Sequence, residues 1–235
     1  MFCDWRRLGG RLLRRLAAVS LLACGGCQIL GAATATMQQT QQVAPAYSGF
    51  KGQSVVIMVW ADEAISIDHP TISADLAHNL QDKFHQAIDG KLNEVKGTTF
   101  VKTDDVVRFQ EGHPEAATDS PEELATQFPA TRLIYIEVVS LSLHPNDAVD
   151  LSKGQIVTDV KVVEVADGKG KVAYENDSVS AVYPTKSPPE GTLGLDENTV
   201  YEKSVDAVST EIAKLFMTHD SEDNLEDPSD EKNPT

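Results

Sequence analysis

The chain has 235 residues, a formal net charge of −16 and a sequence pI of about 4.7. With 20 Lys and Arg against 36 Asp and Glu, it has too few basic side chains to neutralise nucleic-acid phosphates, which excludes DNA and RNA as partners. An acidic surface of this kind also gains no electrostatic attraction to anionic lipid. Attachment to a membrane would therefore require a separate anchor.

The N-terminus has the order of regions found in a secretory signal. Five Arg lie between Arg6 and Arg15, residues 16–23 are mostly apolar, and small residues and cysteines follow. The apolar run is too short to cross a bilayer, which needs about 20 apolar residues. We therefore predict that residues 1–23 are a signal peptide. The first 27 residues hold five Arg and one Asp, so the remaining chain has a net charge of −20.

The sequence Leu-Leu-Ala-Cys at residues 21–24 resembles the bacterial lipobox, in which a leucine and a small residue precede a cysteine that becomes lipidated. The resemblance implies that Cys24 is the first mature residue and carries acyl chains such as palmitate, with Cys27 as the alternative. Two or more acyl chains anchor a protein stably to a membrane. A redox pair or half of a zinc site is the competing interpretation of Cys24 and Cys27, although the flanking signal core and polar tether do not favour it.

Residues 24–49 are small, polar and rich in Gln, Ala and Thr, which predicts a flexible tether after the lipidated cysteine. Residues 54–60 form an apolar run typical of a buried strand. An acidic loop over residues 61–70 is expected next. A helix is then expected over residues 74–92, capped by Ser73, because apolar residues recur at every fourth position, namely Leu76, Leu80, Phe84, Ile88 and Leu92.

The middle of the chain predicts short strands over residues 98–101 and 106–109 and then a short helix. Ser120, Pro121 and Glu123 are the cap, first-turn proline and capping-box glutamate of that helix. Residues 132–143 predict a long strand. Two β-rich runs, 155–166 and 171–183, flank an Asp-Gly turn and predict a hairpin, and their slipping alternation indicates a bulge.

A last helix is expected to begin with a capping box at Thr199, and residues 219–235 predict an acidic disordered tail. Residues 50–218 therefore predict one α/β (α+β) domain. It would have a mixed sheet, two long helices, a short one and a late antiparallel hairpin.

This order of elements behind a lipobox resembles the periplasmic lipoprotein domains of the CsgG-like and TolB N-terminal families, LpoB-like activators and the auxiliary lipoproteins of ABC transporters. The resemblance covers residues 50–218 and is carried by the strand 54–60, the helix 74–92, the strand 133–143 and the hairpin at Asp167. It implies a domain that binds proteins or assembles, with a homo-oligomer as one form. No stretch supplies the membrane-spanning hairpins of a curli-type pore.

Two groups of side chains are candidates for chemistry. Asp62, Glu63, Asp68 and His69 follow the first strand, where loops of α/β sheets often carry ligands, and oxygen ligands with one His suit a divalent metal. The alternative, which we favour, is a solvated acidic loop without a metal. The second group, His78, Asp82 and His85, lies within two turns of the first helix. The alternative is an ordinary exposed helix face.

The sequence has none of the common motifs for hydrolases, zinc proteases, P-loops or dinucleotide folds, and we expect no catalytic residue and no cofactor. Trp60, Tyr135, Tyr183 and Tyr201 could line a binding surface but are more often packing residues.

We expect a non-catalytic accessory lipoprotein that faces the periplasm and binds another envelope protein. The alternatives are a ligand- or lipid-binding auxiliary component of an envelope ABC transporter and, last, an unrecognised hydrolase. Gly25 after Cys24 resembles the sorting signal for the outer membrane.

Overall fold

The computed structural model describes residues 41–145, 151–186 and 191–221. The chain divides into two compact units. One unit comprises Met1–Gln42 and Asp220–Thr235. Among its described residues, Ser221 N donates a hydrogen bond to Gln41 O at 2.8 Å. The other unit, Val43–His219, contains the α/β fold. The short strands β1 (Gln42–Val43) and β9 (His219–Asp220) form a two-stranded sheet.

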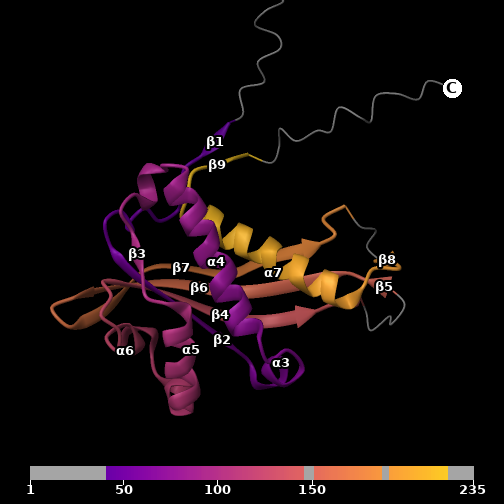
Figure 1. The fold of residues 1–235 in the computed structure, drawn as a ribbon, viewed down its shortest axis with the longest axis horizontal. Coiled ribbons are helices and arrows are strands. Elements are labelled where there is room, and N and C mark those ends of the chain that lie inside the picture. The colour runs from indigo at the N-terminus through magenta and orange to yellow at the C-terminus, as the bar shows by residue number, and fades with distance from the viewer. Residues whose placement is uncertain (1–40, 146–150, 187–190, 222–235) are drawn as a thin grey trace, which may run out of the picture. The chain divides into compact units, whose positions relative to one another are not determined.

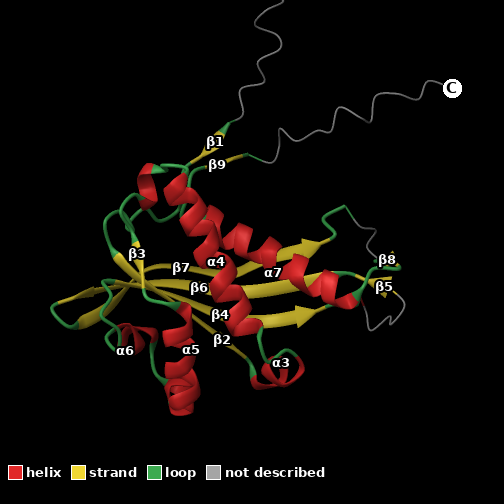
Figure 2. Cartoon of the chain, viewed as in Figure 1, coloured by secondary structure: helices red, strands yellow, loops and turns green. Residues whose placement is uncertain are grey.

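A five-stranded mixed sheet forms the centre of the larger unit (Figures 1 and 2), in the order β3-β2-β4-β6-β7. Its strands are β2 (Ser54–Ala61), β3 (Thr99–Phe100), β4 (Arg132–Ser142), β6 (Gly154–Ala166) and β7 (Lys169–Tyr183). Strand β2 is parallel to both β3 and β4, whereas β4, β6 and β7 are antiparallel neighbours. A second small sheet pairs β5 (Leu151–Ser152) with β8 (Thr192–Leu193). The predicted mixed α/β architecture is confirmed.

Helices pack on both faces of this sheet. Successive side chains of a strand point to opposite faces, and β2 uses both sets for packing. Val55, Ile57 and Val59 join the core beneath the long helices α4 (Ile72–Asp89) and α7 (Glu197–Lys214). Val56 and Met58 join a second core with α5 (Thr103–Gly112) and α6 (Pro121–Ala125). Two 3₁₀ helices, η1 (Asn93–Val95) and η2 (Pro114–Thr118), complete the connections.

An aromatic cluster fixes the larger core beneath α4 and α7. Phe50, Phe84 and Phe216 are all fully buried, and Phe50 meets the other two rings edge-on at centroid distances of 5.6 and 5.2 Å. Burying one such side chain stabilises a fold by about 1.5–3 kcal/mol. Because these three rings come from the segment before β2, from α4 and from the turn after α7, they tie the beginning and end of the domain together.

The helix predicted over residues 74–92 is α4, and its predicted stripe is buried at Leu76, Leu80 and Phe84. The helix begins two residues earlier, at Ile72, and ends at Asp89. Its N-cap is Thr71, not Ser73, and Thr71 makes no side-chain capping bond. Leu92 lies beyond the helix and packs against its core as a partly buried side chain.

Two predictions for irregular or extended structure were wrong. Residues 106–109, expected as a strand, lie within the helix α5, where Thr103 and Val106 are buried one turn apart. A helix forms here because it covers the edge of β2 beyond the two-residue strand β3, where Gln110 Nε2 donates to Val59 O at 2.8 Å.

The loop expected over residues 61–70 contains the helix α3 (Glu63–Asp68). None of its six residues is buried, so it left no apolar periodicity.

The predicted hairpin turn and the predicted cap of the short helix are confirmed, whereas the predicted cap of the last helix was wrong. Asp167 and Gly168 both have positive φ, 51° and 71°, as a two-residue type I′ hairpin requires, and the register shifts between β6 and β7 confirm the predicted bulge. Ser120 and Glu123 form the predicted capping box of α6. The N-cap of the last helix is instead Asp196, whose carboxylate accepts the Thr199 N–H at 3.0 Å.

Candidate functional site

A polar groove of about 330 Å³ lies between α4 and α7. Three carboxylates line it, those of Asp75, Asp82 and Glu202. The remaining described lining residues are Thr71, His78, Asn79, Asn198, Tyr201 and Val205. Among the described residues that line the groove, none is Lys or Arg, so its local potential is negative.

Tyr201 joins the two helices across this groove. It lies in the second turn of α7, and its hydroxyl donates to Asp75 Oδ2, in the first turn of α4, at 2.7 Å. The ring of His69 stacks on the Tyr201 ring at a centroid distance of 5.4 Å and an interplanar angle of 7°. Burial, and then the bond to Asp75, raise the pKa of Tyr201 well above its usual range. The hydroxyl therefore remains a donor at neutral pH, and the ring is held in one orientation.

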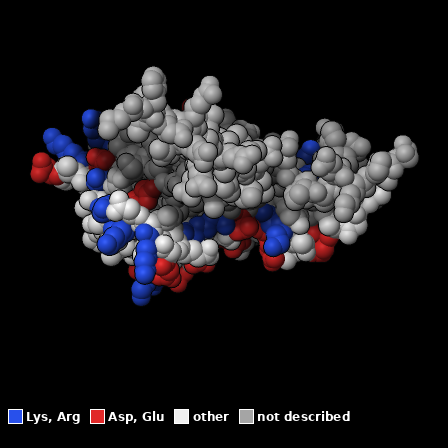
Figure 3. All heavy atoms as spheres, turned by 90° about the horizontal axis from the view of Figure 1, so that it is seen from above, with Lys and Arg blue, Asp and Glu red and all other residues white. Residues whose placement is uncertain are grey.

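Ion pairs surround the groove without filling it. His78 Nε2 lies 3.3 Å from Asp104 Oδ1, with both side chains more than half exposed, and Lys83 Nζ bridges to Asp206 Oδ1 at 2.7 Å. Exposed pairs of this kind contribute about 0–1 kcal/mol, so they orient the rim more than they stabilise it. Acidic and basic side chains also intermingle on the face of the molecule shown in Figure 3.

The structure separates the first group of predicted site residues. Asp62 caps α3, where its Oδ1 accepts the Ala64 N–H at 2.9 Å, and Glu63 and Asp68 are exposed on that helix. His69 ends the helix and turns to Tyr201. Within residues 41–145, 151–186 and 191–221, no group of three His, Cys, Asp or Glu is arranged to hold a metal ion.

The second group is divided as well. His78 and Asp82 line the groove. His85 does not: its Nε2 lies 3.3 Å from Gln81 Nε2, and its ring meets that of Phe100 edge-on at a centroid distance of 5.4 Å. Cys24 and Cys27 lie outside the described residues. In the described parts of the chain, no helix is long and apolar enough to cross a membrane.

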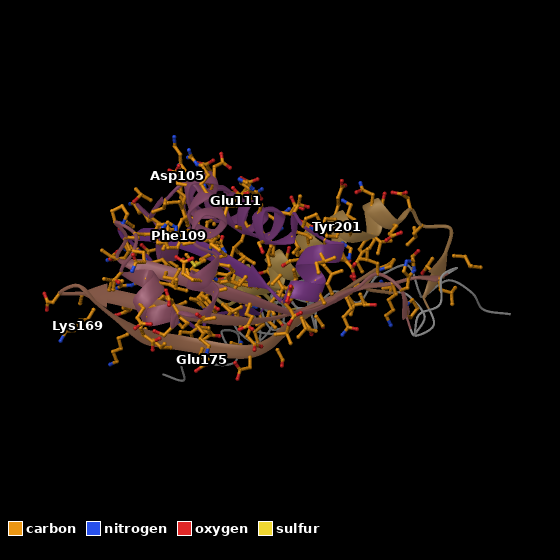
Figure 4. All side chains as sticks on the ribbon, turned by 90° about the horizontal axis from the view of Figure 1, so that it is seen from below. Asp105, Phe109, Glu111, Lys169, Glu175 and Tyr201 are labelled. Atoms are coloured by element: carbon orange, nitrogen blue, oxygen red, sulfur yellow. The ribbon has the colours of Figure 1, made fainter. Side chains whose placement is uncertain are left out.

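The pair of Tyr201 and Asp75 in the groove was hard to predict from the sequence. Tyr201 was one of four aromatic candidates for a binding surface, with packing as the more common role. Asp75 had no predicted role in a site. The two residues are 126 positions apart, and the contact between them depends on how α4 packs against α7. Figure 4 shows Tyr201 on its helix, on the side of the sheet opposite Glu175.

No family model matches the chain, and no curated protein matches it. Similar solved structures include a PelC dodecamer from Paraburkholderia phytofirmans, at 9% identity and a TM-score of 0.38, covering 75% of this chain and 96% of that one. The hypothetical protein CT253 from Chlamydia trachomatis is 15% identical, with a TM-score of 0.40 and coverage of 71% and 91%. The lipoprotein GNA1162 from Neisseria meningitidis is 12% identical, with a TM-score of 0.37 and coverage of 68% and 97%. At these identities and TM-scores, the likenesses do not assign the chain to a family.

Proposed function

We propose that this protein is a bacterial envelope lipoprotein that acts as a non-catalytic accessory or assembly factor by binding another envelope protein. Acyl chains on Cys24 would hold it to a membrane, and the lipobox-like sequence before this residue supports that anchor. Gly25 favours the outer membrane, with the domain facing the periplasm. The finer resemblance to CsgG-like, TolB-like or LpoB-like domains, and a homo-oligomeric form, remain predictions.

The groove between α4 and α7 is the observation that carries the binding role. Three carboxylates and an oriented tyrosine ring line it, without a Lys or Arg among the described lining residues. A Lys or Arg side chain of a partner protein would gain charge-assisted hydrogen bonds from the carboxylates. It would also gain a contact with the exposed part of the Tyr201 ring. We therefore place the partner's basic side chain in this groove.

A photocrosslinking amino acid introduced at Asn79 of the full chain, in the bacterium that makes the protein, tests this contact. Asn79 lines the groove, and Lys203 is an exposed control position on α7 outside it. We expect one adduct of defined mass in the membrane fraction from Asn79 and none from Lys203.

Charge reversal gives the matched control for this crosslink. Asp82→Lys places a cation in the groove and should abolish the adduct. Asp89→Lys makes the same change on the same helix outside the groove and should preserve it. No adduct at Asn79, or an adduct that survives Asp82→Lys, would contradict the proposed contact.

A second candidate function is a ligand-binding auxiliary component of an envelope ABC transporter. A separate cavity of about 230 Å³ beside the end of β2 favours it, because such a component must hold a small molecule. Retention of a small molecule by the purified full chain would support this function, whereas a protein adduct from the groove would support the first.

A further inference from the structure

Strand β7 forms one edge of the five-stranded sheet, and among the described residues no strand pairs with its outer side. The opposite edge of the sheet is protected, because β3 pairs with the first part of β2 and Gln110 of α5 donates to Val59 O. Natural proteins usually cover or charge an edge strand, because its free N–H and C=O groups can pair with another chain. The outer side of β7 is therefore a candidate for pairing with a further strand.

The charged residues of β7 all lie in its first part. Two Lys, one Glu and one Asp precede Ser178, where the pairing with β6 shifts register and φ is 64°. Residues 178–183, Ser-Val-Ser-Ala-Val-Tyr, contain no charged side chain, no proline and no glycine. A strand can therefore add to this half of the edge without burying a charge and without losing a backbone donor.

The side chains of this half alternate between the two faces of the sheet. Val179 is part of the core beneath α4 and α7, and Ala181 packs against that core. Tyr183 pairs with Gly154, where a Cβ would point at Ser204 of α7, so Tyr183 lies on the same face as α7. Tyr183 is only partly buried, and its hydroxyl has no hydrogen-bond partner among the described residues.

A second groove, the edge groove, of about 410 Å³ lies between this part of β7 and the end of α7. Its wall on β7 consists of Asn176 and residues 178–180. Its apolar surface comes from Val43, Ala44, Ala46 and Leu215, and Glu211 and His219 add polar atoms. A largely apolar groove with a few polar groups suits a tyrosine side chain, which has an apolar ring and one hydroxyl.

We propose that residues 178–183 of two copies of this chain pair as antiparallel strands, joining two sheets about a twofold axis. Directly opposite residues of paired strands point to the same face, so each residue faces either itself or a residue an even number of positions away. An axis at Ser180 meets this condition. It also places the acidic residues before Ser178 at opposite ends of the contact, so the two acidic segments do not meet.

This register supplies an occupant for the edge groove. Val179 of one copy faces Ala181 of the other, which extends the apolar face beneath the helices across the axis. Tyr183 of each copy then lies beside Asn176 of the other, where its ring enters the edge groove. The contact is isologous, because each copy gives one tyrosine and receives one. It goes beyond the proposed contact with another protein and does not depend on it.

Sedimentation equilibrium of the full chain, with Cys3, Cys24 and Cys27 replaced by serine, tests this pairing. We expect a reversible dimer of twice the 25.5 kDa chain mass. Ser180→Lys places two like charges opposite each other at the axis and should weaken the dimer about fivefold. Ser142→Lys puts the same charge on an exposed serine of the inner strand β4 and should leave the dimer unchanged.

Cysteines at the same two positions test the register. Directly opposite residues have Cα atoms about 4.5–5.5 Å apart, which a disulfide can span. We therefore expect Ser180→Cys in the same background to form a disulfide dimer under mild oxidation and Ser142→Cys to form far less. Equal urea midpoints of the two lysine variants would show that Ser180→Lys acts on pairing and not on folding. A protein that stays monomeric up to about 1 mM, an unweakened Ser180→Lys dimer, or equal disulfide formation at both positions would overturn the proposal.

Discussion

The packing of α7 on β6 depends on the absence of a side chain at Gly154. A Cβ at this position would overlap Ser204 Oγ and lie 3.0 Å from both Ser204 Cβ and Val200 Cγ1. Ser204 is fully buried and its hydroxyl donates to Val200 O at 2.7 Å. Gly154→Ala therefore forces α7 away from β6 or breaks this bond. Since Tyr201 lies on the same turn of α7, the groove should be displaced as well.

The expected loss can be estimated from two opposing effects. Overpacking of a close-packed interior costs about 1–3 kcal/mol. Replacing a glycine in a strand with alanine recovers about 0.5–1 kcal/mol through the lower entropy of the unfolded chain. We therefore expect Gly154→Ala to lower the free energy of unfolding by about 1–2 kcal/mol, measured by urea denaturation of the full chain.

A second substitution tests whether the overlap is the cause. Ser204→Ala removes the overlapping oxygen and should cost little alone, because the Val200 carbonyl retains its helical hydrogen bond. In the double variant with Gly154→Ala, about 1 kcal/mol of the loss should be recovered. Gly154→Ala with unchanged stability, or a double variant no more stable than the single one, would refute this account of the α7–β6 contact.

Two further predictions concern the tyrosines. Tyr201→Phe removes the 2.7 Å bond to Asp75 and leaves the ring in place, so it should lower the free energy of unfolding by about 1 kcal/mol. An unchanged urea midpoint would contradict it. Burial raises the pKa of both Tyr47 and Tyr135 to about 12, from 10.0 in the unfolded chain. Because the folded state holds these protons more tightly, stability should be complete below pH 10 and fall as pH rises from about 10 toward 12. Urea unfolding across this window should show the loss, and a smaller one in Tyr47→Phe. A loss of the same size in that variant would show that Tyr47 is not a source.

Elements with a strong local signal were predictable from the sequence. The apolar stripe of α4, the continuous apolar run of β2 and the Asp-Gly turn each specify a structure through their own residues. By contrast, α3 buries none of its residues, so no periodicity marks it. The run at residues 106–109 is short, and its helix depends on the unpaired edge of β2, a distant feature.

The groove between α4 and α7 was predictable only in part. His69, His78 and Asp82 were singled out because polar residues follow a strand and share a helix face. Their common neighbour Tyr201 is more than 100 positions further along the chain. Asp62 was a metal candidate because it belongs to an acidic segment after a strand. It caps α3 instead, because a carboxylate just before a helix accepts a first-turn N–H. Contacts of this kind depend on tertiary packing, to which a single sequence gives no direct guide.

Intact mass spectrometry of the membrane-fraction protein, comparing the unsubstituted chain with Cys24→Ala, tests whether the protein is a lipoprotein anchored through Cys24. We predict a mature chain that begins at Cys24 and carries added acyl mass, and we predict that Cys24→Ala abolishes both the cleavage and the added mass. An unmodified chain, or one cleaved at another position, would contradict the lipoprotein account.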